Sequence, residues 1–316
     1  MRLDIRYQMN FAYAEPVREA HNEVRVRPRD MTGQRLLGYR LSTTPTTRVL
    51  SFTDYWGTTV EHFGHVQSHG RLEILAEAAV ETRPRPVLES APMSALDDQF
   101  RIDNSELLQR SPHVDWTPQH AELARDAISG LGDVKSAMSA IVELTRSRLA
   151  YQRGSTHIGI SLEALVDKGQ GVCQDFAHLT IGFMRSVGIP ARYVSGYLFA
   201  ADETDLEADE DHIVQVLTHA WVEAAIPGQG WWALDPTNDQ PVGERHVVVG
   251  HGRDYDDVAP VRGVYVGDAS PEVEATVEMR RMEQVDRSLS ERPRRRHQPV
   301  AVDLIATELA AQQQQQ

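Results

Sequence analysis

Hydrophobic and polar residues alternate through the first part of the chain. Every second residue is apolar from Leu3 to Met9, and again from Leu72 to Val80. A period of two is typical of a strand with one buried face. Turn-forming residues separate the runs, and these are Pro28, Gly33, Pro45, Gly57 and Gly70. We therefore predict a small antiparallel β-sandwich over residues 1–85.

Helical spacing replaces the alternation in the middle of the chain. Thr117 is a favourable N-cap and Pro118 a favourable first helical residue, so a helix is predicted to begin there. A second helix is predicted over residues 134–149. Ser161 can cap a short third helix, which Gly169 would end.

The clearest helix pattern starts at Cys173. One stripe of this helix is formed by Phe176, Thr180, Phe183 and Val187. Gly188 supplies a C-terminal cap, and Pro190 prevents the helix from continuing.

Strand patterns return after this helix. We predict strands over residues 191–198, 213–222 and 231–235, and further strands near 246–249, 261–266 and 271–280. The turn at Pro227–Gly230 makes a hairpin of the second and third of these. Residues 202–211 are predominantly acidic, and we interpret them as a solvated loop rather than a cation site.

These patterns divide the chain into four parts. They are a β-rich N-terminal domain at 1–85, a linker at 86–116, a core with C-terminal strands at 117–285, and a tail at 286–316. The tail contains a proline-broken basic run at 290–296 and ends in a glutamine homopolymer at 312–316, so we expect disorder there.

The overall charge narrows the set of partners. The chain has 316 residues with 32 basic and 46 acidic side chains, and its net charge is −14. Such an acidic chain is a poor general ligand for nucleic acid or for anionic membranes, so we expect neither partner. No apolar run reaches the length of a membrane span, and the N-terminus lacks a secretory pattern. With its free cysteine, the chain is expected to be cytoplasmic.

Cys173 is the single cysteine of the chain. It follows Gly171 and opens the clearest helix, where the positive end of the helix dipole favours a thiolate. Being alone, it forms neither an internal disulfide nor a multi-cysteine metal site. The residues alone leave two interpretations of Cys173, a reactive thiol or an inert core residue.

The predicted hairpin offers the thiol a base. His219 and Asp235 lie on opposite arms, and their midpoint falls at Pro227, slightly before the centre of the turn. An antiparallel hairpin brings such residues side by side, where a carboxylate can orient an imidazole. Taken singly, His219 could be a packing residue, and Asp235 before Pro236 could be a turn former.

Three sequence blocks together resemble the transglutaminase-like superfamily in its bacterial branch. They read GVCQDFAHLTIGFMRSVGIPARYVSGY from Gly171 to Tyr197, THAWVE from Thr218 to Glu223, and WWALDPTN from Trp231 to Asn238. The blocks match in order and in spacing. The N-terminal region is similar to the β-rich region that accompanies this core, at Pro16-Val17, Arg27-Pro28 and residues 54–57. Residues 252–260 also resemble this branch, so that the resemblance covers about residues 1–285 and is thin near 87–115.

The resemblance implies an α+β, papain-like transglutaminase core, in which the cysteine helix packs on an antiparallel sheet. By motif match, Cys173 is the nucleophile, His219 the general acid/base and Asp235 the orienting carboxylate. The implied chemistry is attack on an amide of a peptide or protein to give a thioester. An amine acceptor would make the chain a transglutaminase, and water a peptidase or amidase. No cofactor and no metal are expected, and the oligomeric state is left open. The alternative is a binding or scaffold protein that retains the fold without catalysis.

Other residues carry weaker signals. His62, His65 and His69 would align as metal ligands on a helix, but the local pattern is strand and turn. His178 is expected to point away from Cys173 as a packing residue. Trp221, Trp231 and Trp232 could line a cleft, although alternation puts the last two on opposite faces and predicts at least one of them in the core.

Overall fold

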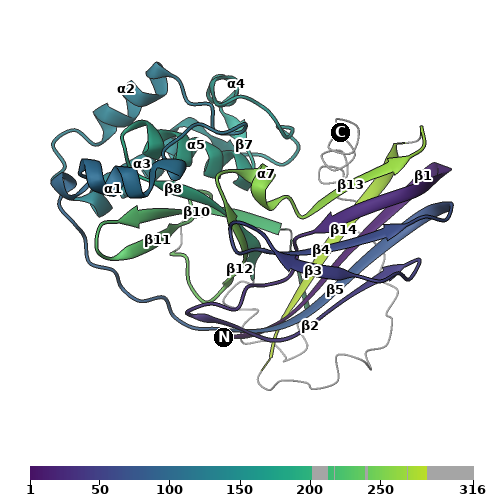
Figure 1. The fold of residues 1–316 in the computed structure, drawn as a ribbon. Helices are drawn as coiled ribbons and strands as arrows, with labels where there is room; N and C mark the ends of the chain where they lie inside the picture. Colours follow the sequence, from purple (N-terminus) through teal and green to yellow (C-terminus); the bar gives the residue numbers. More distant parts are fainter. Residues whose placement is uncertain (201–212, 217, 239–240, 269, 283–316) are drawn as a thin grey trace.

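The computed structural model describes residues 1–200, 213–216, 218–238, 241–268 and 270–282. Figure 1 shows a helical layer, a small sheet beneath it and a larger, curved sheet on the other side. The predicted acidic loop and the predicted disordered tail both lie outside the described residues.

One long strand organises the larger sheet. β1 runs from Arg2 to Val24 and pairs antiparallel with four other strands. The eight strands of this sheet are β1, β2 (Gln34–Thr44), β3 (Leu50–Thr53), β4 (Thr59–His65), β5 (His69–Thr82), β9 (Ile213–Val216), β13 (Val261–Val266) and β14 (Pro271–Arg281). The predicted alternation holds in β1, because Leu3, Ile5, Tyr7 and Met9 are all buried.

β1 is longer than the short strands expected from the turn signals. Its register with β5 shifts between Ala12 and Val17, and Glu19 has a positive φ of 51°. An irregularity of this kind bends a strand and allows it to change partners. The first half of β1 therefore pairs with β5 and β14, and the second half pairs with β4 and β13.

Strands from both ends of the chain share this sheet. Leu3 pairs with Arg281 and Tyr13 with Pro271, so β14 closes against the first strand. The division of the chain at residues 85 and 116 stays a prediction.

The helices cover one face of the small sheet. They are η1 (Met93–Ala95), α1 (Asp98–Asp103), η2 (Ser105–Leu107), α2 (Pro118–Ala127), α3 (Val134–Arg148), α4 (Leu162–Lys168), α5 (Cys173–Ser186) and α7 (Tyr255–Val258). The predicted starts are confirmed, because the side chains of Thr117 and Ser161 accept backbone N–H groups at α2 and α4. A two-stranded pair, β6 (Ala150–Tyr151) and β7 (Gln170–Gly171), leads into α5.

The small sheet holds the predicted hairpin. Its strand order is β11 (Gly230–Leu234), β10 (Thr218–Ile226), β8 (Ala191–Leu198) and β12 (His246–Gly252). α5 packs on β10 and β8, and its buried side chains join theirs in one hydrophobic core. On the other side, Tyr197 and Val247 belong to the core of the larger sheet. The predicted α+β fold, with a cysteine helix on an antiparallel sheet, is confirmed. Among the described residues, no helix has both the length and the apolar character needed to cross a bilayer.

We predict that Gly196→Ala destabilises the small sheet. Gly196 pairs with His219, and a Cβ there would lie 2.6 Å from the Trp221 Cη2 atom and would also overlap the backbone oxygen of Val247. Overpacking of this kind costs about 1–3 kcal/mol of unfolding free energy, which urea denaturation measures. Gly70→Ala is the matched control in β5, because no atom lies within 4 Å of its added Cβ. Equal stability of the two variants would contradict the prediction.

Candidate active site

Cys173 is the first residue of α5, as the sequence predicts, and its side chain is partly exposed. The helix start is capped from within, because Asp175 Oδ2 accepts the Val172 N–H at 2.8 Å and the Thr156 hydroxyl at 2.5 Å. A Cβ on Gly171 would lie 2.9 Å from that carboxylate oxygen. Gly171 is therefore needed so that Asp175 can fold back and fix the turn that carries the thiol.

His219 and Asp235 meet by a route that differs from the expected one. Val222 pairs with Leu234 in the hairpin, and this register would set His219 opposite Thr237. The contact forms because β11 ends at Leu234 and the chain then turns. Asp235 Oδ1 accepts the N–H groups of Thr237 and Asn238 at 3.0 and 3.2 Å. Asp235 is therefore both a turn former and a partner of the histidine.

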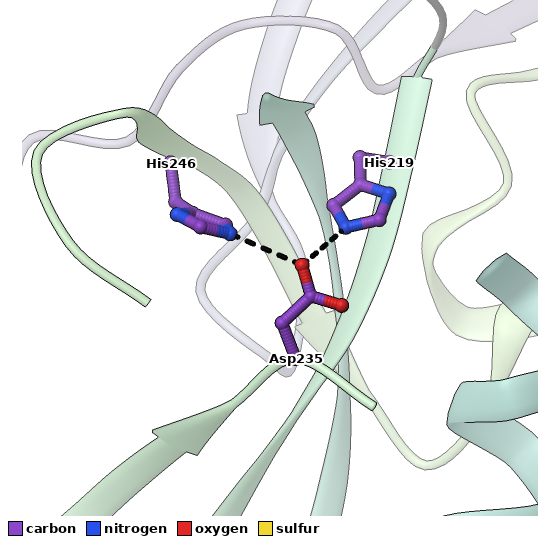
Figure 2. A group of neighbouring side chains, drawn as sticks. All are labelled: His219, Asp235 and His246. Carbon is purple, nitrogen blue, oxygen red and sulfur yellow. Dashed lines mark hydrogen bonds and ion pairs between the residues drawn. The ribbon is translucent and has the colours of Figure 1, made fainter. Parts of the chain in front are cut away.

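The histidine and the carboxylate form a buried pair. His219 Nε2 lies 2.8 Å from Asp235 Oδ2, as Figure 2 shows. The Asp235 side chain is 0% exposed and that of His219 is 9% exposed. The Asn238 amide donates to the same carboxylate oxygen at 2.9 Å. Solvent screening of this pair is therefore weak.

The surroundings set the charges of the pair. Burial alone would lower the pKa of His219, but hydrogen bonds to Asp235 and Cys173, and the charges of both, raise it to about 10. Burial would raise the pKa of Asp235, but its hydrogen bonds to His219, His246 and Asn238 hold it well below the usual range. At neutral pH the site therefore contains an imidazolium and a carboxylate.

Cys173 lies close enough to His219 to contribute to the raised pKa of that ring. Since Nε2 of that ring faces Asp235, Nδ1 is the atom left to face the sulfur. The structure thus brings together Cys173, His219 and Asp235, the three residues selected from the sequence.

His246 is a fourth member that sequence reasoning missed. Its Nε2 lies 3.3 Å from Asp235 Oδ2, and its Nδ1 accepts the Gly243 N–H at 3.3 Å. Burial lowers the pKa of His246 despite the nearby carboxylate, so the ring is neutral and its Nε2–H donates to Asp235. The strand predicted near 246–249 begins at His246, and the sequence pattern assigns this residue no other role. Its role arises because β12 pairs with β8 and not with the hairpin.

Three side chains of the site, those of His219, Asp235 and His246, are of types that bind metal ions. One ligand atom each from His219, Asp235 and His246 lies within 4.8 Å of the others. Hydrogen bonds account for this arrangement, since a ring N–H from each histidine points at one carboxylate oxygen (Figure 2). A metal ion would have to displace both protons.

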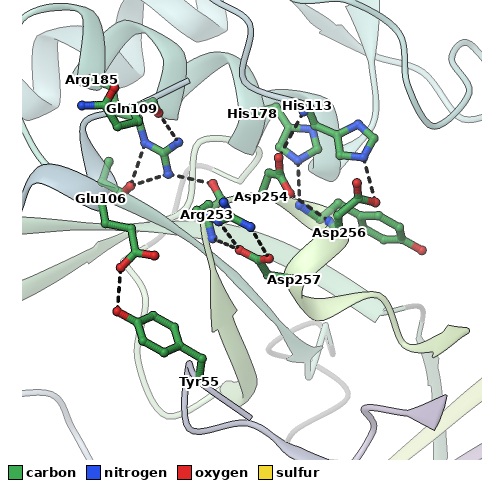
Figure 3. Close-up of polar contacts among 12 residues, drawn as sticks. Tyr55, Glu106, Gln109, His113, His178, Arg185, Arg253, Asp254, Asp256 and Asp257 are labelled. Atoms are coloured by element: carbon green, nitrogen blue, oxygen red, sulfur yellow. Dashed lines mark hydrogen bonds and ion pairs between the residues drawn. The ribbon is translucent and has the colours of Figure 1, made fainter. Parts of the chain in front are cut away.

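The weaker sequence candidates lie elsewhere. His62 and His65 are in β4 and His69 begins β5, so the helical alignment that would make them ligands does not form. His178 is buried and stacks on His113 (Figure 3), and its Nε2 accepts the Tyr255 N–H at 3.2 Å. It is the packing residue that was expected.

The tryptophans divide between core and cleft. Trp221 is fully buried in the small sheet, edge-on to His246 at 5.3 Å between ring centroids. Trp231 and Trp232 are each only partly buried and line one cavity beside Asp235. The expectation that at least one of these two is a core residue is met only partly, because Trp232 packs on the helical core from its edge.

Comparisons with known proteins agree with this geometry. The transglutaminase-like superfamily matches residues 121–236, and the bacterial transglutaminase-like N-terminal region matches residues 3–81. The uncharacterized protein ML0607 of Mycobacterium leprae is 35% identical over 283 residues, which span 89% of this chain and 99% of that protein.

The chain belongs to the transglutaminase-like superfamily. The resemblance drawn from the cysteine, histidine and aspartate blocks is thereby confirmed. The crystal structure of a "putative cysteine protease from Cytophaga hutchinsonii" is similar to the structure of this chain, with a TM-score of 0.70 and 26% sequence identity. The similarity covers 90% of this chain and 92% of that one.

A relative with a named activity shares only part of the core. The protein-glutamine gamma-glutamyltransferase of Pseudomonas aeruginosa is 38% identical over 73 residues. These residues span 23% of this chain and 11% of that protein. The superfamily thus includes relatives described as proteases and as transferases, and both are classes of enzyme.

We predict that the contribution of the His219–Asp235 pair to stability depends on pH. His219 has a raised pKa, so its contribution is complete below 6.5 and is lost as the pH rises through about 10. Asp235 has a lowered pKa, so its contribution is present above 3.8 and is lost as the pH falls further. Between pH 3.8 and 6.5, where both contributions are complete, Asp235→Asn should cost about 3 kcal/mol of unfolding free energy, and outside this range it should cost less.

Urea denaturation across the pH range measures this cost. Asp126→Asn, at an exposed position of α2, is the control and should follow the wild-type curve. A cost of Asp235→Asn that stays constant from acid to alkaline pH would show that the two groups are not linked.

A second prediction concerns His246. His246→Leu removes an N–H donor from Asp235, so we expect Cys173 to be alkylated by iodoacetamide about tenfold more slowly. That factor corresponds to the roughly 1.5 kcal/mol of a hydrogen bond to a charged group. His246→Gln retains a donor and should restore most of the rate. If both variants label at the wild-type rate, His246 does not position the site.

Proposed function

We propose that the chain is a thiol enzyme that cleaves amide bonds of peptides or proteins through a thioester, with Cys173 as nucleophile. The observation that carries this proposal is the position of the His219 ring, which is hydrogen-bonded to Asp235 and lies close enough to Cys173 for the thiol to affect its pKa. A nucleophile, a base and an orienting group in contact are the elements of nucleophilic acyl transfer.

The first half of the reaction forms the thioester. The Cys173 sulfur attacks the amide carbonyl carbon, and the negative charge moves to the carbonyl oxygen. The oxygen can be stabilised by the backbone N–H of Cys173, because the first N–H groups of a helix have no partner within that helix. His219 then gives its proton to the amide nitrogen as the carbon–nitrogen bond breaks, and the amine leaves.

The second half releases the acyl group. Neutral His219 removes a proton from the acceptor, which attacks the thioester carbonyl, and the carbon–sulfur bond breaks. Water as acceptor gives a carboxylic acid, which is the reaction of a peptidase or amidase. An amine as acceptor gives a new amide, which is the reaction of a transglutaminase. Asp235 stabilises the imidazolium in both halves.

We further propose that the enzyme works where thiols stay reduced, as in the cytosol, because the mechanism needs Cys173 as a free thiol. The proposed substrate is a peptide or protein. Names of relatives support this class, since one is described as a protease and another as a transferase acting on protein glutamine.

Thiol labelling tests the proposal directly. Cys173 is the single cysteine, so iodoacetamide incorporation reports this site alone. At neutral pH we expect labelling faster than that of a free thiol, and a slowing of about tenfold in His219→Ala, because the sulfur loses the neighbouring group that acts as its base. His21→Ala, at an exposed position of β1, is the control.

Incubation with a glutamine-bearing protein and a fluorescent amine then identifies the acceptor. Amine incorporation that is lost in Cys173→Ala supports transfer, and shortened peptides support proteolysis. Labelling no faster than that of a free thiol and indifferent to His219→Ala would favour a scaffold that retains the fold without catalysis.

A further inference from the structure

A cavity of about 890 Å³ adjoins the candidate site. One wall is the face of α3 that carries Lys135 and Arg146, and another is β11. The segment that follows β5 passes beside the small sheet on its way to α1 (Figure 1), and several of its residues, Arg83 and Leu88 among them, line the same cavity. Asp235, Asn238 and His246 line the same cavity, so the groove extends to the carboxylate that holds His219.

β11 is an edge strand in this groove. Within the part of the chain that the structure describes, it pairs with β10 alone, at one end of the order β11-β10-β8-β12. Its second edge therefore offers backbone N–H and C=O groups to an added strand. An extended peptide can pair with such an edge, and its side chains then point alternately to either side.

The groove is rich in cations although the chain as a whole is acidic. Its basic lining residues are Arg83, Arg85, Lys135, Arg146 and Arg192, and its acidic ones are Glu143, Glu223 and Asp235. Each of the three carboxylates is paired, because Asp235 lies against His219, Glu223 against two arginines and Glu143 against Arg146, and the basic lining residues still outnumber the acidic ones. The groove is thus locally positive in a protein whose net charge is −14.

Glu223 fixes two of these cations. It is buried, and its Oε1 accepts from Arg85 at 2.9 Å while its Oε2 accepts from Arg192 at 2.6 and 3.0 Å. One carboxylate between two guanidinium groups leaves an excess positive charge. Burial would raise the pKa of Glu223, but His251 and the arginines hold it well below the usual range, so that the carboxylate stays ionised.

The two tryptophans hold cations on both faces of β11. Arg192 lies 4.1 Å from the Trp231 ring centroid, and Lys135 lies 4.8 Å from that of Trp232. Lys135 Nζ donates to the Leu88 backbone oxygen and makes no ion pair with any described residue. Cations therefore lie on both faces of β11, Arg192 from β8 on one and Lys135 from α3 on the other.

We propose that this groove binds the acyl-donor substrate as an extended peptide with acidic side chains, laid along the open edge of β11. The inference rests on the proposed function, since it assigns the substrate class of the same site. Acidic side chains on either face of the peptide would meet Arg192 and Lys135, and the reacting amide would lie beyond Leu234, near His219.

A peptide fits this groove better than a nucleic acid does. The open strand edge pairs with a peptide backbone and offers no equivalent to a phosphodiester chain. The net charge of −14 also repels a polyanion, whereas a peptide with a few carboxylates experiences mainly the local field of the groove.

Binding is measured without chemistry, on the full chain carrying Cys173→Ala. The probes are fluorescein-labelled peptides with one glutamine flanked by glutamates, by serines or by lysines, and the readout is fluorescence anisotropy. We expect the glutamate peptide to bind about tenfold more tightly than the lysine peptide, and the preference to shrink at high salt as charges are screened.

A single charge in the groove is then removed. Lys135→Gln should weaken binding of the glutamate peptide about two- to fivefold, the effect of one partly exposed charge pair. Lys135→Arg should restore it. Arg125→Gln is the matched control, because it removes one positive charge from an exposed position of α2 outside the groove. Arg83→Gln, whose side chain is 72% exposed, repeats the test at a position that bears little on folding.

Equal binding of the three peptides, or equal effects of Lys135→Gln and Arg125→Gln, would overturn the inference. So would a single-stranded oligonucleotide that displaces the glutamate peptide at the same concentration as the unlabelled peptide does. These outcomes are independent of thiol reactivity. The enzyme proposal can therefore survive if the peptide preference fails, and the peptide preference can survive if Cys173 proves unreactive.

Discussion

The buried contact between His219 and Asp235 is the interaction on which the candidate site depends. It joins a strand residue to a carboxylate that a turn holds in place, and it keeps the imidazole charged next to Cys173. A buried charge pair is stable only when each partner is fully hydrogen-bonded. Asn238 and His246 meet that requirement by donating to the same carboxylate oxygen.

Several parts of the fold hold the His219–Asp235 contact and the Cys173 thiol in place. Gly196 of β8 leaves space for the ring of Trp221, which lies in the same strand as His219. The side chain of Asp175 caps the first turn of α5 and fixes its position. Packing of α5 on β10 sets the distance between thiol and imidazole. The larger sheet supports the opposite face of the small sheet through Tyr197 and Val247. A change in any of these layers therefore reaches the site by packing and needs no direct contact with it.

Charge is distributed unevenly around this centre. The chain carries an excess of acidic residues, yet the groove beside Asp235 is lined mainly by basic ones. Glu223 concentrates Arg85 and Arg192 there, and the tryptophans of β11 hold Arg192 and Lys135 against the strand. These cations lie beside an edge strand of the small sheet, so the groove next to Asp235 is locally positive.

Local patterns in the sequence determined the helix that begins at Cys173, the caps at Thr117 and Ser161, and the hairpin that carries His219. Such features depend on neighbours within a few residues, which is why periodicity and turn chemistry reveal them. Only the tertiary structure decided that β14 pairs with β1 and that His246 contacts the Asp235 carboxylate. It also decided that the turn after Leu234 brings Asp235 to His219, although the two residues are not opposite each other in the hairpin. These contacts join segments that are distant in the chain or out of register in the hairpin, so they depend on how the sheets pack, and no local pattern encodes that packing.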